Sequence, residues 1–339
     1  MRNETRLAFN AYMQQIAQLN GVEDASVKFT TSATAQQTLE TKIQESSDFL
    51  SRVNTVGVRD LIGEKVGLGV GSTIASNTDT SGNAERQTSD PTTLDDRQYH
   101  CRKNNFDSHL KYSKLDAWSK FPDFQTRIRD VILQRMALDR MTIGFNGTSY
   151  APDSDRSANP LLQDVNIGWL QQYRNNAAAR VMAEVQAASG KVNVYAGGDY
   201  ENLDALVFDA VNSLIDPWFR SDPDLVVILG RNLMTDKYFP IINQNQPSTE
   251  TLASDIVISQ KRIGRLPAVT VPFFPDNSMM VTSYDNLSVY WQEGGRRRHV
   301  KEKPERDRIE NYESSNDAYE IEDYGKGCLI ENIDTTKPA

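Results

Sequence analysis

The residue types that most often do chemistry in proteins are scarce in this chain, and their spacing matches no familiar site. The two cysteines and three histidines are too scattered to suggest a zinc site or a cysteine nucleophile beside a histidine. We expect the cysteines to be buried thiols and the histidines to belong to strands or to charged surface. These residues are Cys101, Cys328, His100, His109 and His299.

Carboxylates are abundant, and in other proteins they serve as general acids, general bases or metal ligands. Four aspartates between residues 200 and 285 are the most suggestive set, but they flank expected strands and helices, where capping and solvation explain them. They are Asp222, Asp224, Asp236 and Asp255. The sequence therefore predicts no catalytic residue, no metal site and no cofactor, and we expect the protein not to be an enzyme.

A cluster of glycines is the one feature that hints at phosphate binding. Gly67, Gly69 and Gly71 are closely spaced, but they lie in an alternating, strand-like run with no helix after it. Phosphate sites built on such glycines need the N-terminus of a helix behind them. We therefore interpret the cluster as a strand whose backbone is closely approached by another segment.

Composition and charge exclude several classes of protein. The 339 residues are 38% hydrophobic and carry a formal net charge of −9, which argues against a protein that reads nucleic-acid sequence through a basic face. No stretch approaches the roughly 18 apolar residues of a membrane-spanning helix, so we expect no membrane partner. The N-terminus is polar and unlike a secretory signal, and the low cysteine content suggests a reducing compartment.

Charge is strongly patterned toward the C-terminus. Residues 293–308 hold seven Lys or Arg and four acids, whereas residues 309–339 hold eight acids and two lysines. The basic run is either a patch for nucleic-acid phosphates or one side of a charged contact between subunits, and the alternating acids favour the contact. A basic and an acidic strand of one domain can also simply face each other. The candidate contact residues are Arg296, Arg297, Arg298, Arg306 and Arg308.

The N-terminal third predicts two separate elements. Apolar spacing indicates a helix over 1–19, followed at 30–37 by a polar, flexible linker. From 55 to 117 the pattern changes to period two, with a turn-forming stretch at 76–83, and predicts two long antiparallel strands. Such a hairpin cannot bury its outer half against itself. It must lie on its own domain or reach a neighbouring molecule.

The clearest helix covers 121–143, with Pro122 in its first turn and glycines after it. A further helical run is expected around 168–188. Asp199 is a candidate N-cap for a helix at 200–216.

Residues 200–285 are predicted to form a compact α/β unit. The continuous apolar run 225–229 is typical of a strand covered on both faces. A second helix is expected through 232–239, and strands at 255–259, 268–274, 279–282 and again from 286 to 333. The whole is an α+β protein with a long projecting hairpin.

Ten short segments, in this order along nearly the whole chain, carry a resemblance to a known family. They are QESSDFL at 44–50, GFNG at 144–147, DRS at 155–157, NP at 159–160, LQDV at 162–165, GWLQ at 168–171, DPDLVVI at 222–228, ISQKRIG at 258–264, LPAV at 266–269 and ENYES at 310–314. The chain resembles the P2-like major capsid proteins of tailed bacteriophages, which have the HK97 fold.

The resemblance implies a division of the chain. Residues 1–29 would be an internal scaffolding segment, removed by a phage protease near Phe29 and Thr30. The parts that follow would be an N-arm (30–54), an E-loop hairpin over the adjacent subunit (55–117), a P domain (118–199) with its spine helix (121–143), an A domain around the capsomer axis (200–285), and a return to the P domain with a C-terminal tail (286–339).

The resemblance also implies the function. Subunits would form hexamers and pentamers of an icosahedral procapsid and capsid, assembled in the host bacterial cytoplasm and found in the virion. The shell would enclose double-stranded DNA without reading its sequence. The other partners would be an internal scaffold or protease protein and a portal protein. The alternatives are an encapsulin-like cellular compartment, an enzyme built on 200–285, and a nucleic-acid-binding protein acting through 296–308.

Overall fold

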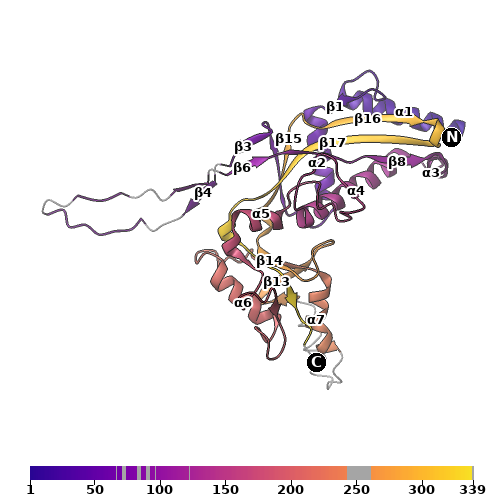
Figure 1. Ribbon diagram of the computed structural model, residues 1–339. Coiled ribbons are helices and arrows are strands. Elements are labelled where there is room, and N and C mark those ends of the chain that lie inside the picture. The colour runs from indigo at the N-terminus through magenta and orange to yellow at the C-terminus, as the bar shows by residue number, and fades with distance from the viewer. Residues whose placement is uncertain are drawn as a thin grey trace.

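The computed structural model describes residues 1–65, 67–70, 74–81, 85–88, 92–95, 97–121, 123–242 and 261–337. An elongated body holds the N-terminus, a smaller unit holds the C-terminus, and a long hairpin projects from the body (Figure 1). The expected helix at 121–143 is present three residues later, as α4 (Phe124–Asn146).

The body is built on a seven-stranded sheet. The order of five strands is β1-β16-β17-β15-β2, and β7 and β8 also pair with β17. The strands are β1 (Phe29–Thr30), β2 (Asn54–Val58), β7 (Arg102–Asn105), β8 (Ser108–Lys111), β15 (Leu287–Gln292), β16 (Arg297–Lys303) and β17 (Arg308–Ile321). At 14 residues, β17 is long enough to pair with four strands, so it organises the body.

In the part of the chain that the structure describes, the body has five α-helices: α1 (Asn3–Asn20), α2 (Ala33–Glu45), α3 (Tyr112–Trp118), α4 and α5 (Trp169–Asn176). The core between α4, α5 and the sheet is rich in aromatic rings. Trp169 is fully buried, with its ring centroid 5.2 Å from that of Phe145 and 5.5 Å from that of Tyr319. Its indole N–H donates to the carbonyl oxygen of Ser288 at 3.0 Å. Edge-to-face aromatic pairs of this kind stabilise beyond their buried area.

The smaller unit is a second core. Its six-stranded sheet has the order β12-β13-β11-β14-β18-β9. The strands are β9 (Val181–Met182), β11 (Val226–Leu229), β12 (Arg262–Ile263), β13 (Leu266–Thr270), β14 (Met279–Thr282) and β18 (Cys328–Ile330), and the helices are α6 (Leu203–Leu214) and α7 (Arg231–Ile242). All four residues of β11 are buried, as the apolar run predicts. The strand expected at 255–259 lies outside the described residues.

The projecting hairpin is shorter than the sequence predicts. It consists of β3 (Ile62–Glu64) paired with β6 (Gln98–His100), and β4 (Gly67–Val70) paired with β5 (Thr92–Asp95), both antiparallel. The flanking parts of 55–117 belong to the body: β2 runs parallel to β15, while β7 and β8 pair with β17. An alternating pattern does not tell a strand of the hairpin from a strand of the sheet, because both are half buried.

Three local expectations are wrong. The supposed linker 30–37 contains the start of α2, whose N-cap Ser32 accepts from the backbone N–H of Ala35. The α-helix in the run 168–188 ends at Asn176, and the chain then continues into β9, the edge strand that pairs with β18. The N-cap of α6 is Asn202, which accepts from the backbone N–H of Ala205 at 2.9 Å.

Two short elements close the C-terminal end. β10 (Val192–Asn193) runs parallel to β19 (Ile333–Asp334). Asp199, which we expected to cap α6, instead accepts from the backbone N–H of Asn193 at 2.9 Å and so holds the loop that precedes α6.

Candidate functional site

The bond between Phe29 and Thr30 lies at an edge of the large sheet. These two residues form β1, paired antiparallel with Arg298 and Arg297 of β16. The backbone N–H of Thr31 continues the pairing by donating to the carbonyl oxygen of Arg296 at 3.0 Å. Phe29 is buried and Thr30 is exposed. A protease needs an extended, unpaired segment, so cleavage here requires β1 to separate from β16.

The structure separates the five candidate contact arginines into two kinds. Arg297 in β16 and Arg306 in the turn between β16 and β17 are exposed. Arg308 is bound to Glu310, two residues along its own strand. Arg298 donates to the side-chain oxygens of Asn311 at 2.9 Å and Tyr12 at 3.0 Å. Of the five candidates, Arg297 and Arg306 are therefore the two that are exposed.

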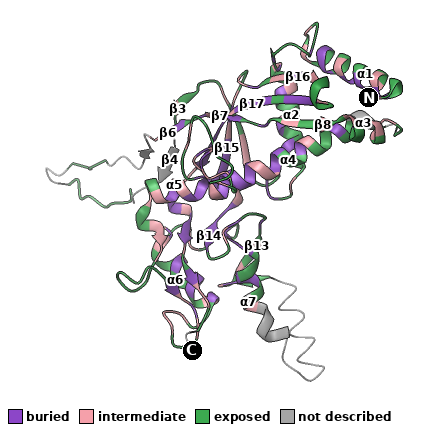
Figure 2. Cartoon of the chain, turned by 45° about the vertical axis from the view of Figure 1, so that its right-hand side comes forward, coloured by how far each residue is buried: buried purple, intermediate pink, exposed green. Residues whose placement is uncertain are grey.

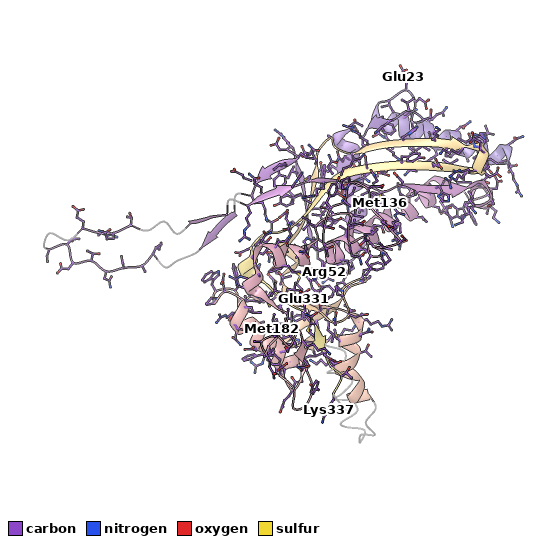
Figure 3. The ribbon with its side chains drawn as sticks, viewed as in Figure 1. Glu23, Arg52, Met136, Met182, Glu331 and Lys337 are labelled. Atoms are coloured by element: carbon purple, nitrogen blue, oxygen red, sulfur yellow. The ribbon has the colours of Figure 1, made fainter. Side chains whose placement is uncertain are left out.

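Arg296 is not a surface contact, and that expectation is wrong. Its side chain is fully buried, and its guanidinium forms ion pairs with Glu40 of α2 at 2.6 Å and Glu313 of β17 at 2.6 Å. It also contacts the sulfur of Met136 on α4 at 3.7 Å (Figure 3 labels Met136). The alternative that the basic and acidic strands of one domain face each other is correct for Arg296, because its partner Glu313 lies on β17.

The ion pairs of Arg296 extend into a buried network, which we call the arginine cluster: Glu40, Arg140, Arg296, Glu313 and Asp317. Arg140 on α4 is ion-paired with Glu40 and, at 3.3 Å, with Asp317. Its members come from α2, α4, β17 and the residue before β16. Three carboxylates and two guanidiniums are thus held away from water at the junction of these elements.

Burial and ion pairing compete in the arginine cluster. Burial acts to raise the pKa of Glu40, but Arg140 and Arg296 outweigh it and hold that pKa below its ordinary value. The pKa of Glu313 is lowered in the same way by Arg296 and Arg298. Burial, helped by the charge of Glu40, raises the pKa of Asp317. Such networks are strongly disrupted when one partner is removed.

Sequence reasoning did not single out Glu40, Arg140 or Asp317. A usable signal was present: Arg140 follows the buried residues Met136 and Ala137 by four and three positions, so it lies on their face of the helix.

A second buried pair fixes the base of the projecting hairpin. Lys65, which follows β3, donates to the carbonyl oxygen of Ile321 and lies 3.7 Å from the carboxylate of Glu320. Tyr99 of β6 packs on Tyr290 of β15, with ring centroids 5.2 Å apart. The hairpin is therefore anchored to the body at its base.

Two of the residues whose types suggested enzyme chemistry, Asp222 and His299, have structural partners. Asp222 accepts from the backbone N–H of Asp224 at 2.9 Å and lies 3.3 Å from the ammonium of Lys326. His299 stacks on Tyr312 at 5.8 Å between centroids. Asp236 falls within α7, and Asp255 lies outside the described residues. Within the described ranges, no group of three or more His, Cys, Asp or Glu is placed to hold a metal ion.

Both cysteines are free and buried. Burial raises the pKa of each thiol to about 12, which disfavours the reactive thiolate. Among the described residues, no helix is both long enough and apolar enough to span a membrane.

Comparison with known proteins gives one consistent answer. Residues 8–333 match the model of the family "Phage major capsid protein, P2 family". The chain is 53% identical to the capsid proteins of Escherichia phage P2, over 98% of this chain and 95% of that protein. It is 43% identical to the major capsid protein of Serratia phage KSP20, over 100% and 99% of the two chains.

A solved structure agrees with the sequence matches. The chain superposes on a subunit of a satellite phage P4 procapsid that includes the size determination (Sid) protein, with a TM-score of 0.82, 50% identity and coverage of 99% of both chains. These relatives are structural shell proteins and not enzymes. The mixed helix-and-strand architecture described above is thus a capsid fold, and the chain belongs to the P2 family of phage major capsid proteins.

Proposed function

We propose that this major capsid protein forms hexamers and pentamers that close an icosahedral shell around double-stranded phage DNA, with residues 1–29 removed during maturation. That the chain is a subunit of a virion shell follows from its family membership. The observation that best supports the finer proposal is the projecting hairpin, which needs a neighbour to cover it.

The outer part of the hairpin has little within its own chain to pack on. Beyond the anchored base, and among the residues that the structure describes, β4 and β5 pair only with each other, in a two-stranded ladder that projects away from the body (Figure 1). An isolated two-stranded ribbon is marginally stable in water. Contact with an adjacent copy would supply the missing partner, so we assign residues 62–100, within the expected 55–117, to the E-loop.

The remaining parts of the chain follow from the same proposal. Residues 30–54 would form the N-arm, with α2 held by the arginine cluster. The P domain would contain α4 as its spine helix together with the sheet strands of 286–333. The smaller unit, corresponding to 200–285, would be the A domain around the capsomer axis.

The net charge of −9 suits a container for DNA. Tight neutralisation of phosphates by Lys and Arg would hold packaged DNA on the wall, whereas an acidic subunit lets it slide during packaging and release. A portal protein for DNA entry and an internal scaffold or protease protein complete the proposed set of partners. The encapsulin-like alternative loses its support, because the full-length relatives are phage capsid proteins.

The intact mass of subunits from mature particles tests the proposed processing. We expect a subunit that lacks residues 1–29, because the bond from Phe29 to Thr30 lies at a sheet edge where local opening exposes it. Mature particles built from full-length subunits would contradict the proposal. Subunits from particles made without the protease partner serve as the control and should keep their full mass.

The two exposed arginines of the β16–β17 region test the proposed charged contact between subunits. Replacing both Arg297 and Arg306 by Glu should lower the yield of closed shells severalfold. The urea midpoint of unassembled subunits should stay unchanged, because exposed substitutions usually alter stability by no more than about 0.5 kcal/mol. The double Lys variant, which keeps the charge, should assemble normally. Normal shells from the Glu variant would rule out this contact.

A further inference from the structure

The segment proposed for removal is itself a well-fitted helical ligand. We propose that α3, the first half of α4 and the β16–β17 hairpin form a groove for an amphipathic helix, and that α1 stays bound in this groove as a noncovalent ligand after the chain is cut between residues 21 and 30. The biological setting rests on the proposed removal of residues 1–29, but the groove and its ligand do not.

Helical spacing brings four side chains of α1 onto one face. Thr5, Phe9, Tyr12 and Ile16 follow each other at intervals of four, three and four residues, and each is at most 8% exposed. Such spacing is the usual signature of a helix that binds in a groove. Figure 2 shows the buried and exposed stripes along α1.

The groove offers a matching apolar floor. Leu115 of α3, Ile128 of α4, Val300 of β16 and Ile309 of β17 are at most 5% exposed and share one cluster with the apolar anchors of α1. One cavity between helix and floor has a volume of about 20 Å³, about enough for a single water molecule. The fit is therefore close to that of a protein interior.

Polar contacts fix the register of the helix along the groove. Arg6 makes a two-pronged ion pair with Glu302 of β16, at 2.6 and 2.7 Å. The hydroxyl of Tyr112 also donates to Glu302, at 2.6 Å. Six residues further along α1, the hydroxyl of Tyr12 accepts from Arg298 at 3.0 Å. Paired guanidinium–carboxylate contacts are among the stronger and more directional hydrogen bonds in proteins.

The connection from α1 to β1 is mostly exposed, and Ala25 is its one buried residue between Gly21 and Lys28. Gly21, with φ +64°, ends the helix, and the chain then turns through an exposed loop whose apex carries Glu23 (Figure 3). The loop has one backbone hydrogen bond to the sheet, from the N–H of Val300 to the carbonyl oxygen of Ala25 at 3.4 Å. A cut in the loop removes the tether, whose effective concentration is in the millimolar range, and leaves the contacts of α1 intact.

It follows that cleavage alone does not empty the groove. The groove opens only when a competing helix displaces α1 or when the β16–β17 region rearranges. Cleavage thus changes α1 from a fixed part of the subunit into an exchangeable ligand.

The test uses the full-length chain with a site-specific protease sequence inserted between Glu23 and Asp24, both of which are exposed. Unassembled subunits at about 1 μM are cut to completion and passed through a size-exclusion column. We expect the N-terminal fragment to elute with the body. The Phe9→Ala/Ile16→Ala variant should weaken retention roughly a hundredfold or more, so that its fragment elutes separately.

Exposed leucines of α1 supply the matched control. Leu7 and Leu19 are 70% and 66% exposed, so Leu7→Ala/Leu19→Ala should leave the fragment bound. Circular dichroism of each uncut variant checks that the body remains folded. Separate elution of the wild-type fragment, or equal loss from both double variants in folded bodies, would overturn the inference. Because the cut is engineered, this result is independent of the natural processing site, which the mass of mature subunits tests.

Discussion

The Arg296→Met variant should lose about 3–5 kcal/mol of its free energy of unfolding, the usual effect of removing one partner from a buried ion pair. Arg296 is fully buried between Glu40 and Glu313. Without it, Glu313 loses its ion-pair partner, and Glu40 and Asp317 are left with the guanidinium of Arg140 in a site that excludes water. Urea unfolding of unassembled subunits measures the effect.

The adjacent residue provides the control. Arg297 lies next in the chain and carries the same charge, but its side chain is exposed. Arg297→Met should shift the free energy of unfolding by no more than about 0.5 kcal/mol. Equal urea midpoints for the two variants would show that the arginine cluster does not stabilise the subunit.

The loss in Arg296→Met should also depend on pH, with a definite sign. The pKa values of Glu40 and Glu313 are held below 4.5, their ordinary value. A lowered carboxyl pKa contributes stability that is present above the unfolded-state pKa and is lost as pH falls through the folded-state pKa. Since the variant has lost a cause of that lowering, its deficit against the wild type should shrink as pH falls from about 4.5 through the folded-state pKa values of Glu40 and Glu313.

The Gly147→Ala variant should lose about 3 kcal/mol or more, through overpacking that no side chain can relieve. A Cβ atom on Gly147 would lie within 3.0 Å of the carbonyl oxygens of Asn166 and Ile143, both of which are backbone atoms. Gly147 has φ −63°, which any residue adopts, so the whole cost comes from the close approach of the chain segments. Thermal unfolding of unassembled subunits measures it.

A second glycine, Gly190, distinguishes the cost of crowding from the cost of backbone strain. Gly190 has φ +63° but nothing within 4 Å of an added Cβ. Gly190→Ala should therefore lose only about 1–2 kcal/mol, the cost of a left-handed conformation. If Gly147→Ala is as stable as Gly190→Ala or more so, the contact between the end of α4 and the segment before α5 is not as tight as described.

The sequence predicts those elements whose apolar pattern is unambiguous. The long helix α4 and the buried strand β11 appear within three residues of their expected positions, because each is defined by a continuous or regularly spaced apolar set. The family could also be recognised from short segments of the sequence. Some of these segments, such as GFNG at 144–147, are needed where the chain packs closely against itself. Gly144 and Gly147 both lie where an added Cβ would collide with a neighbour.

The elements that sequence reasoning missed are held by polar groups. The start of α2 looks like a linker because its inward residues include Gln36 and Glu40, not aliphatic side chains. Gln36 is fully buried and donates to the carbonyl oxygen of Gln292 at 2.9 Å. A periodicity analysis counts such residues as exposed, although hydrogen bonds and ion pairs allow them to be buried. Arg296 was placed on the surface for the same reason.

The central claim is that the hairpin at 62–100 completes its packing on another copy of the chain within a closed shell. Cryo-electron microscopy of particles assembled with the scaffold and protease partners tests it most directly. The account predicts icosahedral shells with five- and sixfold capsomers, in which each hairpin lies over the adjacent subunit. Shells in which the hairpin contacts only its own subunit, or a protein that forms no closed shell with its partners, would contradict it.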